Sequence, residues 1–271
     1  MVRSLWTAAS GMAAQQTYVD TISNNLANIN TTGFKKDQAE FKTLLYQNIQ
    51  QKTTDAEGNP KPVGAQVGLG VRTAAITSQY AQGSLTATGN TTDLAIEGDG
   101  FFMVRLEDGS TGYTRNGSFK FMVGNEGLTL ATAEGYPVLD NTGNPIVIPQ
   151  NLSSSSITID ASGRVCYPDA DNNAQSIGIQ IGLAQFADPA GLEKNYGSIL
   201  KETDASGVAV IETIGGTLKN SKIHQGYLEA SNVQAVDEMV NLIVAQRAYE
   251  MNSKAITASD EMLRQANNLR Q

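Results

Sequence analysis

The fold of this chain is decided by its two ends, RSLWTAASGMAAQQTYVDTISNNLANI (residues 3–29) and VQAVDEMVNLIVAQRAYEMNSKAITASDEMLRQANNL (residues 233–269). In both stretches apolar residues recur every seven positions, with a second series three or four positions on, as in helices that pack face to face. In the first stretch the two series are Leu5, Met12, Val19 and Leu26, and Ala8, Gln15, Ile22 and Ile29. We therefore expect a long amphipathic helix at each end, and we expect the two to pack as a coiled coil.

The C-terminal stretch carries more apolar surface than one partner helix covers. Its two series are Ala235, Leu242, Tyr249, Ile256 and Leu263, and Ala248, Met251, Ala255, Ala258, Met262 and Leu269. If one series faces the N-terminal helix, the other stays open, and an open apolar stripe indicates contact with another subunit. The predicted packing and interface residues are Leu5, Met12, Val19, Ile22, Leu26, Ile29, Phe34, Val236, Met239, Leu242, Ile243, Tyr249, Ile256, Met262 and Leu263.

The middle of the chain has a different character. Short runs rich in Val, Ile, Phe and Thr alternate with turn signals such as Asp108-Gly109 and Asn116-Gly117, which are typical of β-hairpins. We therefore predict an α+β fold. An all-β domain of residues 66–225 is inserted into a discontinuous helical domain made of residues 1–30 and 226–271.

Residues 31–65 connect the predicted domains. Gly33 is a natural left-handed stop for the first helix, and Phe34 follows as an apolar anchor. The apolar spacing of residues 37–50 fits a short helix or an extended segment. Residues 51–64 are polar and rich in Gly and Pro, which on composition alone predicts a surface loop.

Composition narrows the class of protein. The net charge of −8 and the pI of about 4.7, without a run of Lys and Arg, argue against nucleic-acid binding. The single cysteine, Cys166, excludes an intrachain disulfide. The N-terminal stretch lacks the continuous apolar run of a cleaved secretory leader, and no stretch of 18 apolar residues predicts a membrane-spanning helix.

The sequence contains only weak matches to motifs for catalysis or for metal binding. His224 is the single histidine, so a two-histidine metal site cannot form. Residues 169–173 resemble the opening of a calcium loop, but Ala174 stands where glycine is needed and Gln180 where glutamate is needed. The acid pairs Glu97/Asp99 and Glu107/Asp108 lie on turns, where carboxylates usually face water. We therefore predict no catalytic, cofactor or metal site, and a protein that is not an enzyme.

Four motifs resemble those of the bacterial flagellar rod and hook proteins. They are Asn24-Asn25-Leu26-Ala27-Asn28 leading into Thr32-Gly33-Phe34-Lys35, then GDGFF at 98–102, YTRNGSF at 113–119, and Gln246-Arg247-Ala248-Tyr249-Glu250. The resemblance covers essentially the whole chain. Within this family, the extra stretch at about 47–64 resembles that of the distal-rod members, where it implies packing between subunits rather than a plain loop.

The resemblance implies a structural subunit of the flagellar basal body. Copies polymerise into a stiff hollow shaft that crosses the periplasm and transmits torque from motor to hook. It implies contacts with proximal rod proteins below, the hook protein above and the bushing rings around the rod. It also implies passage through the flagellar type III export apparatus without a cleaved signal, and it implies neither nucleic-acid binding nor membrane insertion.

Three other interpretations stay open on the sequence. The nearest is a proximal rod member of the same family. A secreted, β-rich enzyme acting on carbohydrate would require converging acids in a cleft. A trimeric adhesin would require parallel helices from three chains.

Overall fold

The computed structural model describes residues 2–50, 65–124, 127–149, 156–168, 174–212 and 220–268. These residues form an α+β protein with two compact units. The first unit comprises residues 1–27, 37–78 and 234–271, and the second comprises residues 28–36 and 79–233. Of the predicted insertion at about 47–64, residues 51–64 lie outside the described residues, as does the calcium-like stretch at 169–173.

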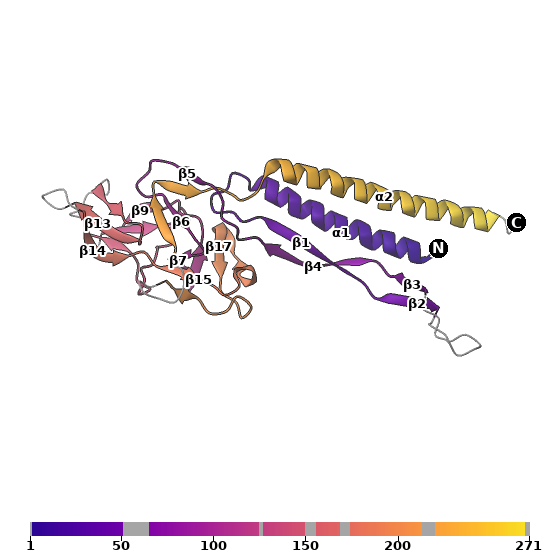
Figure 1. Ribbon diagram of the computed structural model, residues 1–271, viewed down its shortest axis with the longest axis horizontal. Helices are drawn as coiled ribbons and strands as arrows, with labels where there is room; N and C mark the ends of the chain where they lie inside the picture. The colour runs from indigo at the N-terminus through magenta and orange to yellow at the C-terminus, as the bar shows by residue number, and fades with distance from the viewer. Residues whose placement is uncertain are drawn as a thin grey trace, which may run out of the picture. The chain divides into compact units, whose positions relative to one another are not determined.

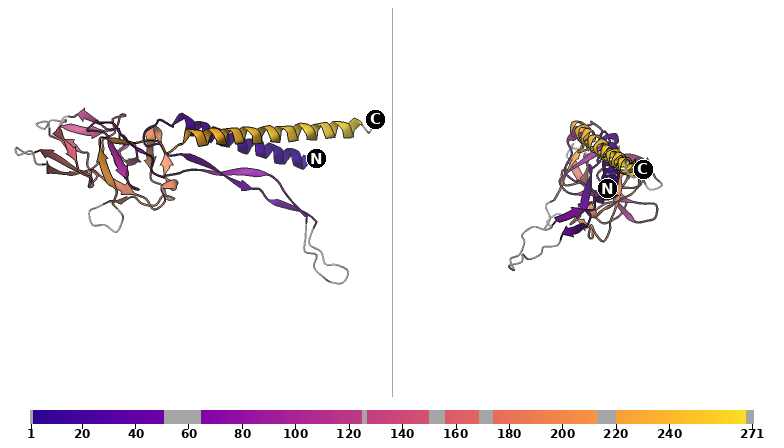
Figure 2. Two further views of the ribbon diagram at one scale, coloured as in Figure 1. Left: turned by 45° about the horizontal axis from the view of Figure 1, so that its top comes forward. Right: turned by 90° about the vertical axis from the view of Figure 1, so that its right-hand side faces the viewer.

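The first unit combines two long helices with a β-ribbon (Figure 1). Helix α1 spans Val2–Ala27 and α2 spans Ala235–Asn268, so the predicted helices are present with their ends shifted by one or two residues. The two helices lie side by side with the chain termini at the same end (Figures 1 and 2). They are therefore antiparallel, and Ile29 lies beyond the end of α1.

Residues 37–50 are extended, which settles the alternative that their spacing left open. They form β1 (Asp37–Thr43) and β2 (Tyr46–Gln50), which pair antiparallel with β4 (Val71–Ser78) and β3 (Ala65–Gly68). Burial alternates at the start of β1, where Asp37 and Ala39 are buried and Gln38 is exposed. That two-residue period is the signature of a strand with one covered face.

The boundaries of the units differ from the predicted ones at 66 and 226. Because β3 and β4 pair with β2 and β1, residues 65–78 belong to the unit that contains the helices. Residues 226–233 belong to the β-rich unit, where β20 (Tyr227–Glu229) pairs with β5 (Leu85–Ala87).

The second unit is built from antiparallel strands. Its largest sheet has the order β16-β17-β8-β7-β15-β18, formed by Glu193–Lys194, Ile199–Lys201, Thr111–Thr114, Phe101–Arg105, Leu183–Gln185 and Val210–Ile211. Two three-stranded sheets follow, β11-β10-β9 (Val147–Ile148, Leu128–Ala131, Lys120–Val123) and β12-β13-β14 (Thr158–Ile159, Arg164–Pro168, Ala174–Gln180). Strand β19 (Lys222–Gln225) pairs with β6 (Leu94–Glu97), and two short 3-10 turns cover Pro189–Gly191 and Tyr196–Ser198.

Strand β7 is buried on both faces and therefore separates two apolar clusters. Phe102 and Val104 enter the larger cluster, whereas Phe101 and Met103 enter the smaller one. The Phe102 ring stands edge-on to Phe119 with centroids 5.0 Å apart, and neither side chain has exposed surface. The second unit thus has a well-packed core of its own.

Replacing Phe102 by alanine should remove the centre of the larger cluster. We expect Phe102→Ala to lower the free energy of unfolding of the β-rich unit by about 3–5 kcal/mol, because a buried ring is replaced by a cavity. Urea unfolding followed by near-ultraviolet circular dichroism measures the change. Val208→Ala, at a position that is 77 % exposed, is the control and should change stability by less than about 0.5 kcal/mol.

Tyr113, in the smaller cluster, predicts a loss of stability at alkaline pH. Burial, with the nearby Glu202 carboxylate, raises the pKa of Tyr113 from 10.0 to about 12. Because the folded-state pKa lies above the unfolded one, the stability contributed by Tyr113 is present below pH 10 and is lost as the pH rises toward 12. The unfolding free energy of Tyr113→Phe should therefore fall less steeply over that range than that of the wild type. Equal slopes would contradict this assignment, and Tyr196→Phe, at a ring that is 80 % exposed, is the matched control.

Candidate assembly interface

Helices α1 and α2 meet along a seam of small and polar side chains. Three pairs mark it: Ser4 with Ser259, whose hydroxyl oxygens are 3.3 Å apart, Gly11 with Asn252, and Asn25 with Glu238. At Gly11 an added Cβ would lie 2.9 Å from Nδ2 of Asn252, so the close approach depends on glycine. The alanines buried on the two helices are Ala8, Ala14 and Ala245.

Asn25 connects α1 to both α2 and the ribbon. Its Nδ2 donates to the carbonyl oxygen of Asp37 at 2.8 Å and to Oε2 of Glu238 at 3.2 Å, and its Oδ1 accepts from the amide of Asp37 at 2.8 Å. Ser78 donates to Oδ1 of Asp37 at 2.8 Å. Asn25 and Glu238 are each 1 % exposed, so this network is buried and fixes the register of three elements.

The structure divides the predicted interface residues into two groups. One group is buried or half-buried in the first unit: Leu5, Met12, Val19, Ile22, Leu26, Leu242, Ile256 and Leu263. The other group is exposed on α2: Val236, Met239, Ile243, Tyr249 and Met262. Ile29 and Phe34 belong to the second unit instead, where the Phe34 ring lies 5.5 Å from Nζ of Lys194.

Three members of the exposed group, Val236, Met239 and Ile243, lie among other exposed apolar residues near the start of α2. Val240 and Val244, which the sequence interpretation did not single out, are 54 % and 59 % exposed. We call this surface the α2 outer patch, formed by Val236, Met239, Val240, Ile243 and Val244. The run VDEMVNLIV carries the signal, because every one of its bulky residues except Leu242 is more than half exposed. An exposed apolar patch of this kind marks an interaction surface.

The exposed polar part of the C-terminal motif makes a local contact. Arg247 and Glu250 form an ion pair 3.7 Å long, one turn apart on α2, with both side chains more than half exposed. Such an exposed pair contributes little to stability. Gln246 is exposed as well, so this part of the motif is accessible.

Three motif segments, at residues 32–35, 98–102 and 113–119, lie in the second unit near one buried carboxylate. Glu229, which is 2 % exposed, accepts from Nζ of Lys35 at 2.6 Å and lies 3.5 Å from Nη1 of Arg115. Nη2 of Arg115 donates to the carbonyl oxygen of Gly98 at 2.8 Å, and the Arg115 guanidinium lies 4.9 Å from the Phe101 ring centre. Burial lowers the pKa of Lys35 and of Arg115, and attraction to Glu229 opposes that shift. We call these three charged residues the Glu229 cluster.

Glycine permits the close packing around this cluster. Gly33 has φ +69°, its amide donates to the carbonyl oxygen of Glu229 at 2.8 Å, and a Cβ there would lie 2.7 Å from the Arg115 backbone. Thr32 donates to Oδ1 of Asn116 at 2.8 Å. The motifs are evident in the sequence, but the pairing of Lys35 with Glu229 is not, because residues far apart in the chain leave no local signal of their contact.

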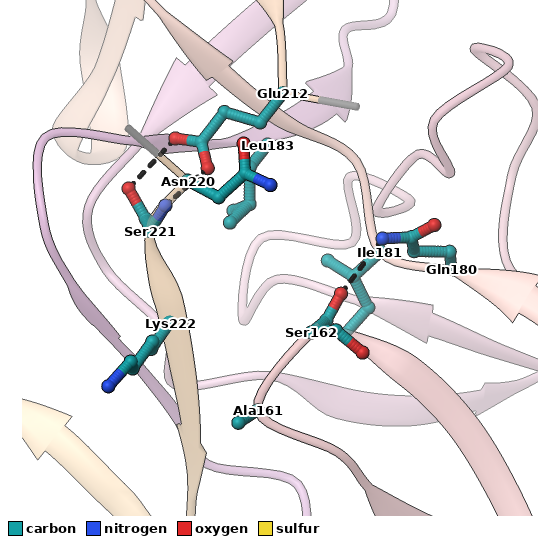
Figure 3. A pocket seen from close by; sticks show the side chains of 9 residues that line it. All are labelled: Ala161, Ser162, Gln180, Ile181, Leu183, Glu212, Asn220, Ser221 and Lys222. Carbon is teal, nitrogen blue, oxygen red and sulfur yellow. Dashed lines mark hydrogen bonds between the residues drawn. The ribbon is translucent and has the colours of Figure 1, made fainter. Parts of the chain in front are cut away.

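A surface pocket of about 280 Å³ lies in the second unit (Figure 3). At one side of it, Glu212 accepts from the amide and the hydroxyl of Ser221 at 2.6 and 2.8 Å, and from Nε2 of Gln185 at 2.7 Å. The carboxylate therefore holds neighbouring segments together. Within the described part of the chain, no group of three His, Cys, Asp or Glu side chains is placed to hold a metal ion. No helix among these residues is long and apolar enough to cross a membrane.

Removing the charge of Glu229 should leave two buried cations without compensation. We expect Glu229→Gln to lower the unfolding free energy by about 3–5 kcal/mol. Adding Lys35→Met should recover part of the loss, because one buried cation is then removed. Thermal unfolding measures both effects, and Glu97→Gln, which alters the exposed pair with His224, is the control. A loss for Glu229→Gln no larger than that of the control would refute a stabilising role for the cluster.

Comparison with known proteins gives the family. Residues 5–35 match the family described as "Flagella basal body rod protein", residues 95–167 match "Flagellar hook protein FlgE/F/G D1 domain", and residues 224–269 match "Flagellar basal body rod FlgEFG protein C-terminal". The chain is 48 % identical to the flagellar basal-body rod protein FlgG of Borreliella burgdorferi, over 100 % of this chain and 99 % of the relative. It is 44 % identical to FlgG of Caulobacter vibrioides (99 % of this chain, 100 % of the relative) and 40 % identical to FlgG of Bacillus subtilis (100 % of both). The chain therefore belongs to the flagellar basal-body rod protein family.

Proposed function

We propose that this protein polymerises into the distal rod of the bacterial flagellar basal body, a stiff hollow shaft that transmits torque from the motor to the hook. The observation that carries the proposal is the α2 outer patch, because its five bulky side chains are each more than half exposed in a single copy of the chain. Similarity over the full length to proteins named as basal-body rod proteins supports the same function.

Helix packing would provide the polymer contacts. The α1–α2 pair has the heptad spacing of a coiled coil, and we infer that neighbouring copies extend this packing through the outer faces. In a single copy, the exposed apolar side chains of α2 gain nothing from burial. Association would supply that free energy and would order the helical unit at the same time.

The partners and the location follow from the family. We propose contacts with proximal rod proteins below, the hook protein above and the surrounding bushing rings, in a rod that spans the periplasm. Entry would be through the flagellar type III export apparatus without a cleaved signal. We further propose that residues 47–64 pack between neighbouring subunits and stiffen the rod, as the resemblance to distal-rod members suggests.

Substitutions at two adjacent residues of α2 distinguish an effect on assembly from an effect on folding. Ile243 is 56 % exposed, whereas Leu242 is half-buried in the first unit. Ile243→Asp should leave the unfolding free energy of the isolated chain within about 0.5 kcal/mol of wild type. In the polymer it should place a charge in a desolvated contact and abolish rod growth and motility.

Controls make this test specific. Leu242→Asp should destabilise the isolated helical unit as well as block assembly. Val208→Asp, at an apolar position of the second unit that is 77 % exposed, should assemble like wild type. Basal bodies of normal length in cells that produce only Ile243→Asp would rule out the α2 outer patch as an assembly surface.

A further inference from the structure

The first unit exposes a second, contrasting stripe, on α1. It runs at spacings of three and four residues and consists of Trp6, Ala9, Ala13, Gln16, Asp20, Ser23 and Ala27, all of which are exposed. We call it the α1 outer stripe. Apart from Trp6, its members are small or polar, whereas the α2 outer patch is bulky.

We infer that the α2 outer patch of one copy packs on the α1 outer stripe of the next copy. The inference rests on the proposed polymer function and names the faces that meet. Bulky side chains fit between small ones on a facing helix, as in knobs-into-holes packing, so patch against stripe is the closely packed combination. Patch against patch would bring five bulky side chains onto five others and leave Trp6 exposed.

The helix register supports this pairing. Within one chain Ser4, Gly11 and Asn25 face Ser259, Asn252 and Glu238. If neighbouring copies keep the same polarity and axial level, α2 of one copy runs antiparallel to α1 of the next in that same register. The stripe then meets α2 position by position: Ala27 with Val236, Ser23 with Val240, Asp20 with Ile243, Gln16 with Arg247, Ala13 with Glu250, Ala9 with Lys254, and Trp6 with Thr257.

Most facing positions are compatible in size in this register, and the exception is the charged Asp20, which lies opposite the apolar Ile243. Val236 and Val240 meet Ala27 and Ser23, and the long side chains of Glu250 and Lys254 meet two alanines. Asp20 is the one charged member of the stripe, and the cation of Arg247 lies one turn from its level, so an ion pair between copies can form. Lys254 lies within one turn of the level of Trp6, where an ammonium can approach the indole face.

The symmetry of the contact has a consequence. The two faces differ, so each copy offers one face to each of two neighbours, and such a heterologous contact propagates into a helical polymer or a ring. A contact of the patch with itself would instead stop at a two-fold dimer. The inferred pairing therefore continues from copy to copy: at one axial level it closes a ring, and an axial step between successive copies makes it a helical rod.

Two variants test the pairing, each with one face blocked. Ser23→Asp disables the stripe and keeps the patch, whereas Val240→Asp disables the patch and keeps the stripe. Both positions are exposed, so both chains should remain folded by circular dichroism. Each variant alone should sediment as a monomer at concentrations where the wild type polymerises. An equimolar mixture should give a one-to-one dimer that does not extend, because one intact patch meets one intact stripe.

Trp6 provides a second readout, because it is the single tryptophan of the chain and is 71 % exposed. Its fluorescence should shift to the blue in the wild-type polymer and in the mixed dimer, and should stay unshifted in either variant alone. Val208→Asp is the control for an added charge on an exposed apolar residue and should polymerise normally.

The outcomes distinguish failure of the inferred pairing from failure of the proposed polymer function. If Ser23→Asp polymerises like wild type, or if the mixture contains no mixed dimer, the pairing is wrong while the polymer function stands. If the wild-type chain stays monomeric at every concentration, with Trp6 emission unshifted, the proposed function itself is overturned.

Discussion

The structure depends on a helix seam in which small and polar side chains contact one another. Asn25 and Ser4 of α1 contact Glu238 and Ser259 of α2, respectively, and Gly11 of α1 allows contact with Asn252. A side chain larger than glycine at position 11 would push the helices apart. Bulky side chains of α2 are divided between two environments: Leu242, Ile256 and Leu263 are half-buried in the first unit, whereas the α2 outer patch is exposed.

The burial of side chains on α2 differs from that on a typical surface helix. A helix on a globular protein normally buries its bulky stripe and exposes its small and polar residues. Here the intrachain contact relies on close approach and on hydrogen bonds such as those of Asn25, which fix register more than they add stability. The free energy available from burying the exposed apolar side chains of α2 is not used within one chain, and a partner that covered them would make the stability of the unit depend on concentration.

The two helices could be predicted from the sequence, because in a heptad repeat the position of a residue indicates the helix face on which it lies. The repeat predicted both helices to within about two residues, and it predicted an open stripe on α2. It did not show which bulky residues would face outward, since Leu242 and Ile243 are chemically alike and adjacent, and the choice is made by the partner helix. The segment that forms β1 and β2 was undecided because a short apolar run fits either period. The Glu229 cluster was missed because its members lie far apart in the chain and meet only through the tertiary fold.

The two units therefore differ in how they bury their apolar side chains. In the second unit, β7 sends Phe101 and Phe102 into separate clusters, and three buried charges pair beside them, so this unit has a core of its own. In the first unit the corresponding apolar side chains are exposed on α2. The chain enters the second unit at residues 28–36, returns to the first unit at residues 37–78, and re-enters the second unit at residues 79–233. The unit whose helix carries the exposed apolar patch is therefore the one built from both ends of the chain.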